Sequence, residues 1–120
     1  MTFQFKCDST NGFQEVSGSA SFNEHSLQFE YQPIHLGLVR GEVKNATIPF
    51  DQINEVNFID KFFSKKIKIS VTSLKGLDKF PILDDYVIEI PVKRKDKDKA
   101  YEFVVKVNYN LGQYRLSKME

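Results

Sequence analysis

The side chains best suited to nucleophilic chemistry in this sequence are one cysteine and two histidines, Cys7, His25 and His35. A catalytic thiol or hydroxyl needs a base within hydrogen-bond reach. Cys7 instead falls on the apolar face of an alternating segment, which predicts a buried and inert thiol. His25 falls in a turn, and His35 has apolar neighbours in an irregular stretch. The sequence therefore favours a protein that is not an enzyme.

Metal and acid–base chemistry also lack a supporting pattern. Glu24 adds a carboxylate to the cysteine and the histidines, but no two of these residues have an organising spacing such as Cys-x-x-Cys. The adjacent Asp84 and Asp85 are typical of a solvated turn and not of a glycosidase carboxylate pair. The glycines are scattered, so no phosphate-binding loop is predicted. We expect no catalytic residues, no metal and no cofactor.

Two basic clusters form the first candidate contact surface. Lysines flank the pair Phe62–Phe63, and the run KRKDKDK at 93–99 holds five bases and two acids. Aromatic rings beside lysines at a hairpin tip are typical of a peripheral membrane contact, where each Lys near an anionic leaflet adds about 1 kcal/mol. Alternatively, one ring folds back onto the core while the lysines protect an edge strand from aggregation. The predicted membrane-contact residues are Lys61, Phe62, Phe63, Lys65 and Lys66.

The second candidate surface belongs to an amphipathic helix predicted at about 97–115. The stripe expected to pack on the core consists of Ala100, Phe103, Val104, Val107, Leu111 and Tyr114. Asp96 or Asp98 is expected to cap the start, and Gly112 to weaken or end the last turn. A second apolar stripe on the flank consists of Tyr101, Val105, Tyr109 and Leu116. This flank either packs under the loop at 33–41 or forms a protein–protein contact, for which Tyr is a favoured residue.

The chain before this helix alternates with period 2 and predicts seven short antiparallel strands. Asn11-Gly12 indicates a hairpin loop. Pro33 is expected to end one strand, and Pro49 indicates an edge strand or a bulge. Asp51 is expected to cap a single helical turn between two strands. The elements that must position both candidate surfaces are therefore a β-hairpin and the C-terminal helix.

Length and composition limit the class of protein. A chain of 120 residues, 41% hydrophobic with 6 Gly and 4 Pro, predicts one globular domain. No apolar run approaches the roughly 18 residues that span a bilayer, and the N-terminus lacks a signal-peptide pattern. A single cysteine cannot form an internal disulfide, so we expect a cytoplasmic protein.

The net charge of +1 hides two halves of opposite sign. The first sixty residues hold three basic and eight acidic residues, and the last sixty hold fourteen basic and eight acidic residues. This asymmetry excludes a uniformly basic nucleic-acid-binding surface. The basic segments also lack an array of stacking aromatics or a docking helix, so no nucleic-acid partner is expected.

The order of seven strands before one helix, together with TIPFDQINEVNF followed by FFSKKIKISV, resembles the bacterial pleckstrin-homology-like (PH-like) family. The resemblance covers residues 46–115 by pattern and 1–45 by strand count. It implies a mainly β fold with one C-terminal helix: a seven-stranded antiparallel sandwich or barrel, with strands at about 2–92, capped by the helix in a single domain at 1–120. Relatives that bind phosphoinositides carry bases around the first hairpin loop. That loop, 8–12, has none here, so no lipid-binding residue is carried over.

Two functions follow from these patterns. The first is a non-enzymatic interaction or assembly module that self-associates as a homo-oligomer or binds a partner protein through the helix flank. The alternative is a peripheral membrane module that uses the basic-aromatic hairpin on an anionic membrane surface. An enzyme or small-ligand carrier with a cleft near His35 is a third and weaker hypothesis.

Overall fold

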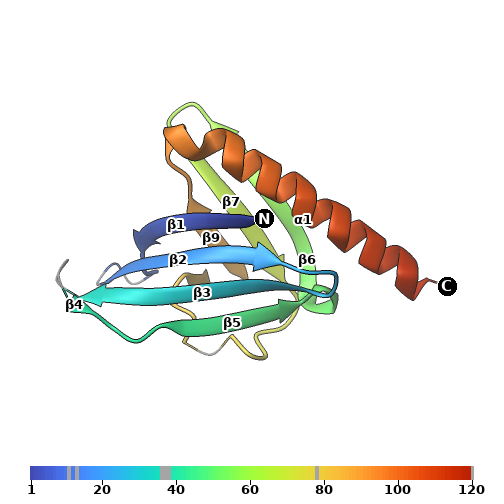
Figure 1. The fold of residues 1–120 in the computed structure, drawn as a ribbon, viewed down its shortest axis with the longest axis horizontal. Coiled ribbons are helices and arrows are strands. Elements are labelled where there is room, and N and C mark those ends of the chain that lie inside the picture. The colour runs from blue at the N-terminus through green and yellow to red at the C-terminus, as the bar shows by residue number, and fades with distance from the viewer. Residues whose placement is uncertain (11, 13, 36–38, 78, 120) are drawn as a thin grey trace.

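The computed structural model describes residues 1–10, 12, 14–35, 39–77 and 79–119. Within these residues the chain forms two antiparallel sheets and one long C-terminal helix (Figure 1). The apolar faces of the strands and of the helix share one hydrophobic core. The predicted mainly β fold, a sandwich capped by a C-terminal helix, is confirmed.

The N-terminal part of the chain forms the first sheet. Its strands are β1 (Thr2–Asp8), β2 (Glu15–Phe22), β3 (Ser26–His35), β4 (Val39–Arg40) and β5 (Lys44–Pro49). β1, β2 and β3 are neighbours in that order, and both β4 and β5 pair with β3. The expected alternation holds in β1, where Phe3, Phe5 and Cys7 are buried while Gln4 and Lys6 are exposed. This sheet therefore has one dry face and one wet face.

The second sheet follows after a 3₁₀ turn, η1 (Phe50–Gln52). Its strands, in sequence order, are β6 (Ile53–Lys61), β7 (Ser64–Val71), β8 (Leu83–Asp84) and β9 (Val87–Pro91). The spatial order is β6-β7-β9-β8. The seven strands predicted from the sequence correspond to β1, β2, β3, β5, β6, β7 and β9. The two-residue strands β4 and β8 were missed, because two residues are too few to show a period.

Several local predictions fall on the prolines and on the turns. The prediction that Pro33 ends a strand is wrong, since β3 continues to His35. The Pro33 carbonyl accepts a hydrogen bond from the Gly41 backbone N–H at 2.8 Å. In a strand the backbone N–H and C=O of one residue point to the same side. The N–H that Pro33 lacks would therefore face the break between β4 and β5. For this reason the proline removes no hydrogen bond between paired strands. Pro49 lies on an edge strand as predicted, because β5 pairs only with β3 among the described residues.

Asp51 does not cap the helical turn. The residue before η1 is Pro49, and no side chain forms a hydrogen bond at that cap. The turn begins one residue earlier than predicted because Phe50 is buried in the core. The centroid of its ring lies 5.8 Å from that of Tyr114. The hairpin predicted at Asn11-Gly12 joins β1 and β2 as expected. Gly12 has a φ of 76°, whereas Asn11 lies outside the described residues.

The helix α1 (Lys97–Lys118) follows a short 3₁₀ turn, η2 (Arg94–Asp96). Asp96 is the residue before its first turn, as predicted, but its side chain forms no capping hydrogen bond. The helix continues past Gly112 to Lys118, so the predicted end near residue 115 is wrong. The predicted core stripe is confirmed. Its buried members are Ala100, Phe103, Val104, Val107 and Leu111, and Tyr114 packs against them half-buried.

Polar side chains of α1 cover the edge of the second sheet. β6 pairs with β7 on one side, and α1 packs along it. The Asn108 side-chain amide donates to the Val56 carbonyl at 2.9 Å. The Arg115 guanidinium donates to the carbonyls of Ile53 and Asn54 at 3.1 and 2.7 Å. The helix therefore satisfies carbonyls that an exposed edge strand would offer to another chain.

Candidate functional site

The turn between β6 and β7 places two phenylalanines in water. β6 ends at Lys61 and β7 begins at Ser64, which pair with each other, so Phe62 and Phe63 alone form the turn. Phe62 is 75% exposed and Phe63 is 95% exposed. Their rings contact each other edge to face. The alternative that one ring folds back onto the core is wrong, because the hairpin carries the turn beyond the sheet (Figure 1).

The lysines around this tip divide into two kinds. Lys65 lies along the hairpin with its side chain only 11% exposed, and its ammonium group is 2.8 Å from Asp60 Oδ1 and 3.1 Å from the Lys61 carbonyl. Lys66 pairs with Glu89 at 2.8 Å across β7 and β9. Lys61 is exposed and forms no ion pair with any described residue. The predicted contact residues therefore comprise two exposed rings, one exposed lysine and two lysines already paired with acids.

Asp60 connects the hairpin to the start of the helix. Its Oδ2 atom lies 3.1 Å from the Lys97 ammonium group, while Oδ1 accepts from Lys65. These two hydrogen bonds, first that from Lys65 and then that from Lys97, hold the pKa of the Asp60 carboxyl below its ordinary value. The carboxylate therefore stays charged and fixes the tip against the first turn of α1.

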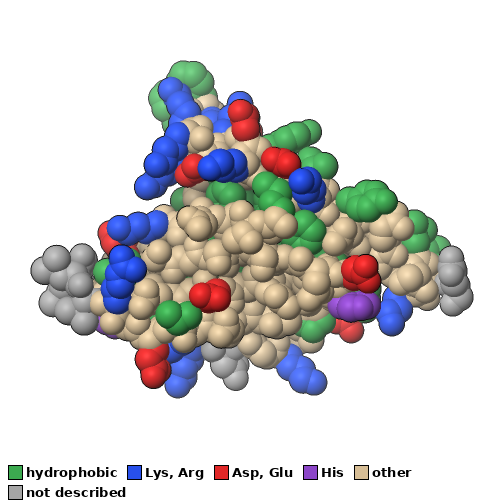
Figure 2. Space-filling view, viewed as in Figure 1, with side chains coloured by type: hydrophobic (Ala, Val, Ile, Leu, Met, Phe, Trp, Pro, Cys, Tyr) green, Lys and Arg blue, Asp and Glu red, His purple; other side chains and the backbone are tan. Residues whose placement is uncertain are grey.

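The second basic segment lies at the same corner of the molecule. The Val92 backbone N–H donates to the Lys65 carbonyl at 2.8 Å, which brings residues 93–99 beside the hairpin. We call residues 60–66 and 93–99, together with Glu89, the basic corner. It holds eight basic and four acidic residues. Figure 2 shows hydrophobic side chains at the top of the molecule with Lys and Arg side chains gathered directly below them.

The flank of α1 forms a separate apolar surface. The four side chains predicted there are all exposed: Tyr101 60%, Val105 48%, Tyr109 66% and Leu116 57%. The alternative that this flank packs under the loop at 33–41 is therefore wrong for these side chains. Of the four, Tyr101 has an aromatic neighbour, with its ring 6.4 Å from that of Phe58 on β6. The flank runs along the solvent side of the helix, away from the core stripe.

The residues considered for catalysis are not brought together. Cys7 is buried in the core, and burial, with a smaller contribution from Asp8, raises the pKa of its thiol to about 11. His25 is exposed in the β2–β3 turn, and His35 is exposed with its Nδ1 atom 3.4 Å from the Gln14 side-chain nitrogen. No group of three or more His, Cys, Asp or Glu residues in the described ranges could hold a metal ion.

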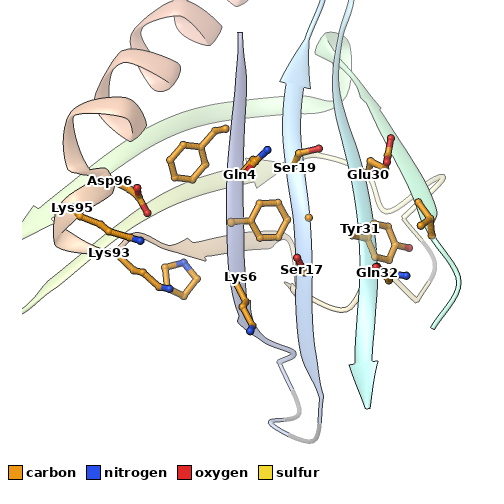
Figure 3. A pocket seen from close by; sticks show the side chains of 15 residues that line it. Gln4, Lys6, Ser17, Ser19, Glu30, Tyr31, Gln32, Lys93, Lys95 and Asp96 are labelled. Atoms are coloured by element: carbon orange, nitrogen blue, oxygen red, sulfur yellow. The ribbon is translucent and has the colours of Figure 1, made fainter. Parts of the chain in front are cut away.

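A groove that the sequence did not predict crosses the wet face of the first sheet. It has a volume of about 460 Å³, and its floor is formed by Ser17 and Ser19 of β2. Figure 3 shows Lys93, Lys95 and Asp96 along one side, and Gln4, Lys6, Glu30 and Gln32 on the neighbouring strands. Bases and acids both line the groove, so the lining does not select an anion or a cation. It was missed because segments distant in sequence build it, namely strands β1, β2 and β3, Val43, and the stretch from Pro91 to Asp96.

Comparisons with known proteins give no relative for this chain: no family model matches it, and neither a curated protein nor a solved structure does. Among the residues described, no helix is at once long enough and apolar enough to cross a membrane.

Proposed function

We propose that this protein is a cytoplasmic peripheral membrane-binding module that inserts the tip of the β6–β7 hairpin into an anionic membrane surface. The observation that carries the proposal is the exposure of both rings of the tip, Phe62 and Phe63. Moving one exposed Phe side chain out of water contributes about 1.5–3 kcal/mol when it is fully buried. Neither ring has a place in the core, so a bilayer interface supplies the burial that the fold does not.

The charge around the tip supports an anionic surface. The basic corner has an excess of four positive charges, and Lys61 lies directly beside the rings. Each basic residue held near an anionic leaflet contributes about 1 kcal/mol, and the contribution falls with added salt. Ring insertion and charge attraction act together, as in other proteins that need two signals for stable membrane association.

The experiment for this function is co-sedimentation with lipid vesicles. We expect binding to vesicles that contain phosphatidylserine, weaker binding to vesicles of phosphatidylcholine alone, and a loss of binding as salt is raised. Replacing both rings of the tip should weaken binding in every lipid mixture, because the ring contribution does not depend on lipid charge.

A protein-interaction or assembly module is the second candidate function. The specific observation in its favour is the exposed stripe of Tyr101, Val105, Tyr109 and Leu116 on α1. Four large apolar side chains are exposed along one side of the helix, and exposed apolar patches mark interaction sites on soluble proteins. We also propose that the chain is related to the bacterial PH-like family, and the order of seven longer strands followed by one helix supports this proposal.

A further inference from the structure

Gly112 lies inside the C-terminal third of α1, and no contact within its own chain requires a glycine there. Beyond the neighbouring residues and backbone of its own helix, a methyl group added there would meet no atom of the described residues within 4 Å, and Gly112 has no left-handed φ that would require glycine. Glycine inside a helix costs about 0.8–1 kcal/mol relative to alanine. It lies on the exposed flank, between Tyr109 and Leu116. A missing side chain at this position leaves room for something that approaches the helix from outside.

The residues around this gap have a symmetric spacing. Val105, Tyr109, Gly112 and Leu116 follow one another at steps of 4, 3 and 4, so the pattern is the same when read from either end of the helix. If two copies of α1 lie antiparallel and meet at the point midway between Tyr109 and Gly112, Tyr109 of each copy faces Gly112 of the other. Val105 then faces Leu116, also twice. Such a pairing has closed two-fold symmetry and no free end.

We propose that the flank of α1 binds a second copy of this chain in an antiparallel helix pair, with the Tyr109 ring packed on Gly112 of the other copy. A large side chain over a glycine fills the gap and lets the two helices approach closely, which is the complementarity that helix pairs use. This inference develops the second candidate function and does not depend on the membrane contact.

The charges flanking the stripe permit this pairing. Lys106 and Gln113 lie on one side of it, and Asn108 and Arg115 lie on the other. In the antiparallel arrangement Lys106 therefore faces Gln113 of the other copy, while the side chains of Asn108 and Arg115 stay bound to carbonyls of β6 on their own chain. No two like charges are brought opposite each other. Lys106 is also paired with Glu102 on its own helix at 2.9 Å, so its charge is already balanced.

The small area of the flank is typical of a weak and reversible contact. An aromatic side chain buries about 150–250 Å² in total, so Tyr109 at its observed exposure can bury roughly 100–160 Å². With its neighbours, the stripe offers on the order of 400–500 Å² per copy, which is at the small end of protein interfaces. We therefore expect a reversible dimer with a Kd of about 10–100 μM.

The first test is sedimentation equilibrium without lipid, over about 1 to 500 μM protein. We expect a monomer–dimer equilibrium that Gly112→Gln weakens at least tenfold, because the new side chain occupies the place of the Tyr109 ring. The same variant should unfold at a higher temperature than the parent when dilute, because Gln is a better helix former. Ser117→Gln introduces the same side chain at an exposed position of the helix outside the stripe and should leave the Kd unchanged.

The register is tested by disulfide cross-linking in a glutathione buffer. A mixture of Tyr109→Cys and Gly112→Cys proteins should cross-link several-fold more than either variant alone, while buried Cys7 stays unreactive. A protein that is monomeric at every concentration would overturn self-association. The flank of α1 would then be a candidate contact for a different protein. Preferential cross-linking of either variant with itself would overturn the antiparallel register. Both tests omit lipid, so vesicle binding by Phe62 and Phe63 stands or fails separately.

Discussion

The rings of Phe62 and Phe63 meet edge to face at the tip of the β6–β7 hairpin, with their centroids 4.6 Å apart and their planes at 90°. An aromatic pair of this geometry contributes about 0.5–1.5 kcal/mol beyond the burial of its area. The pair is thus already assembled in water, and a two-residue turn limits its freedom. Insertion of an assembled pair loses less conformational entropy than insertion of two mobile side chains.

Asp60→Asn should strengthen binding to anionic vesicles by roughly fivefold. The change removes one negative charge from the basic corner and releases both Lys65 and Lys97 from ion pairs. One unit of charge near an anionic leaflet is worth about 1 kcal/mol, and a factor of ten corresponds to about 1.4 kcal/mol. The vesicle partition coefficient is the measurement. Asp51→Asn makes the same change of charge at η1, and an equal effect there would show that net charge alone controls binding.

The same carboxylate gives a pH dependence to stability. Lys65 and then Lys97 lower the pKa of Asp60 in the folded protein below 3.8, its value in a model compound. The contribution of Asp60 is therefore complete above pH 3.8 and is lost as the pH falls through the lowered folded pKa. Urea unfolding at about pH 7 and about pH 3 should show Asp60→Asn less stable than the parent at the higher pH, with the difference diminished at the lower. A difference that grows on acidification would contradict this sign.

Arg115→Ala should destabilise the protein by about 1–2 kcal/mol, since hydrogen bonds to charged donors contribute about 1.5–3 kcal/mol when shielded and less when exposed. The guanidinium bonds to the carbonyls of Ile53 and Asn54, and its loss exposes the edge of β6. Urea unfolding measures the change, and light scattering on heating should show earlier aggregation. Lys106→Ala removes an exposed ion pair on the same helix and should cost less than about 0.5 kcal/mol. Equal losses for the two variants would argue against an edge-covering role.

Gly18→Ala and Gly112→Ala should change stability in opposite directions. A Cβ on Gly18 would lie 2.7 Å from the Glu30 carbonyl oxygen and 2.9 Å from the Phe5 ring, so overpacking should cost about 1–3 kcal/mol. At Gly112 the methyl group meets open space, and helix propensity should add about 0.8–1 kcal/mol. Unfolding of dilute protein, where the monomer prevails, is the measurement. A Gly18→Ala protein as stable as the parent would show that the Glu30 carbonyl and the ring of Phe5 both move away without cost.

The sequence predicted the elements whose patterns repeat within one segment. Alternation located the seven longer strands, and the steps from Ala100 to Leu111 identified the buried face of the helix. The exposed tip at Phe62 and the exposed flank at Tyr109 were also predicted, each with a buried alternative that the structure excludes for the described side chains.

Features that depend on contacts between distant segments could not be predicted. The pairing of Lys66 with Glu89 requires the neighbour relation of β7 and β9, and the bonds from Arg115 require the helix to lie along β6. Gly112 was expected to weaken or end the last turn of the helix because propensity disfavours glycine. Continued packing of Tyr114 against Phe50 carries the helix past it. The groove over Ser17 and Ser19 arises only when β1, β2, β3 and the segment before α1 come together.

The most direct test of the membrane contact is vesicle co-sedimentation of the parent protein beside Phe62→Ser/Phe63→Ser and Tyr86→Ser. Tyr86 is an exposed aromatic residue between β8 and β9, outside the basic corner, and serves as the matched control. We predict that the parent and Tyr86→Ser bind phosphatidylserine-containing vesicles alike at about 50 mM salt and that both lose binding at about 500 mM. The double variant should bind at least roughly tenfold more weakly, because two rings no longer leave water. Equal binding by the double variant and the parent, or no binding by the parent at low salt, would contradict the proposal.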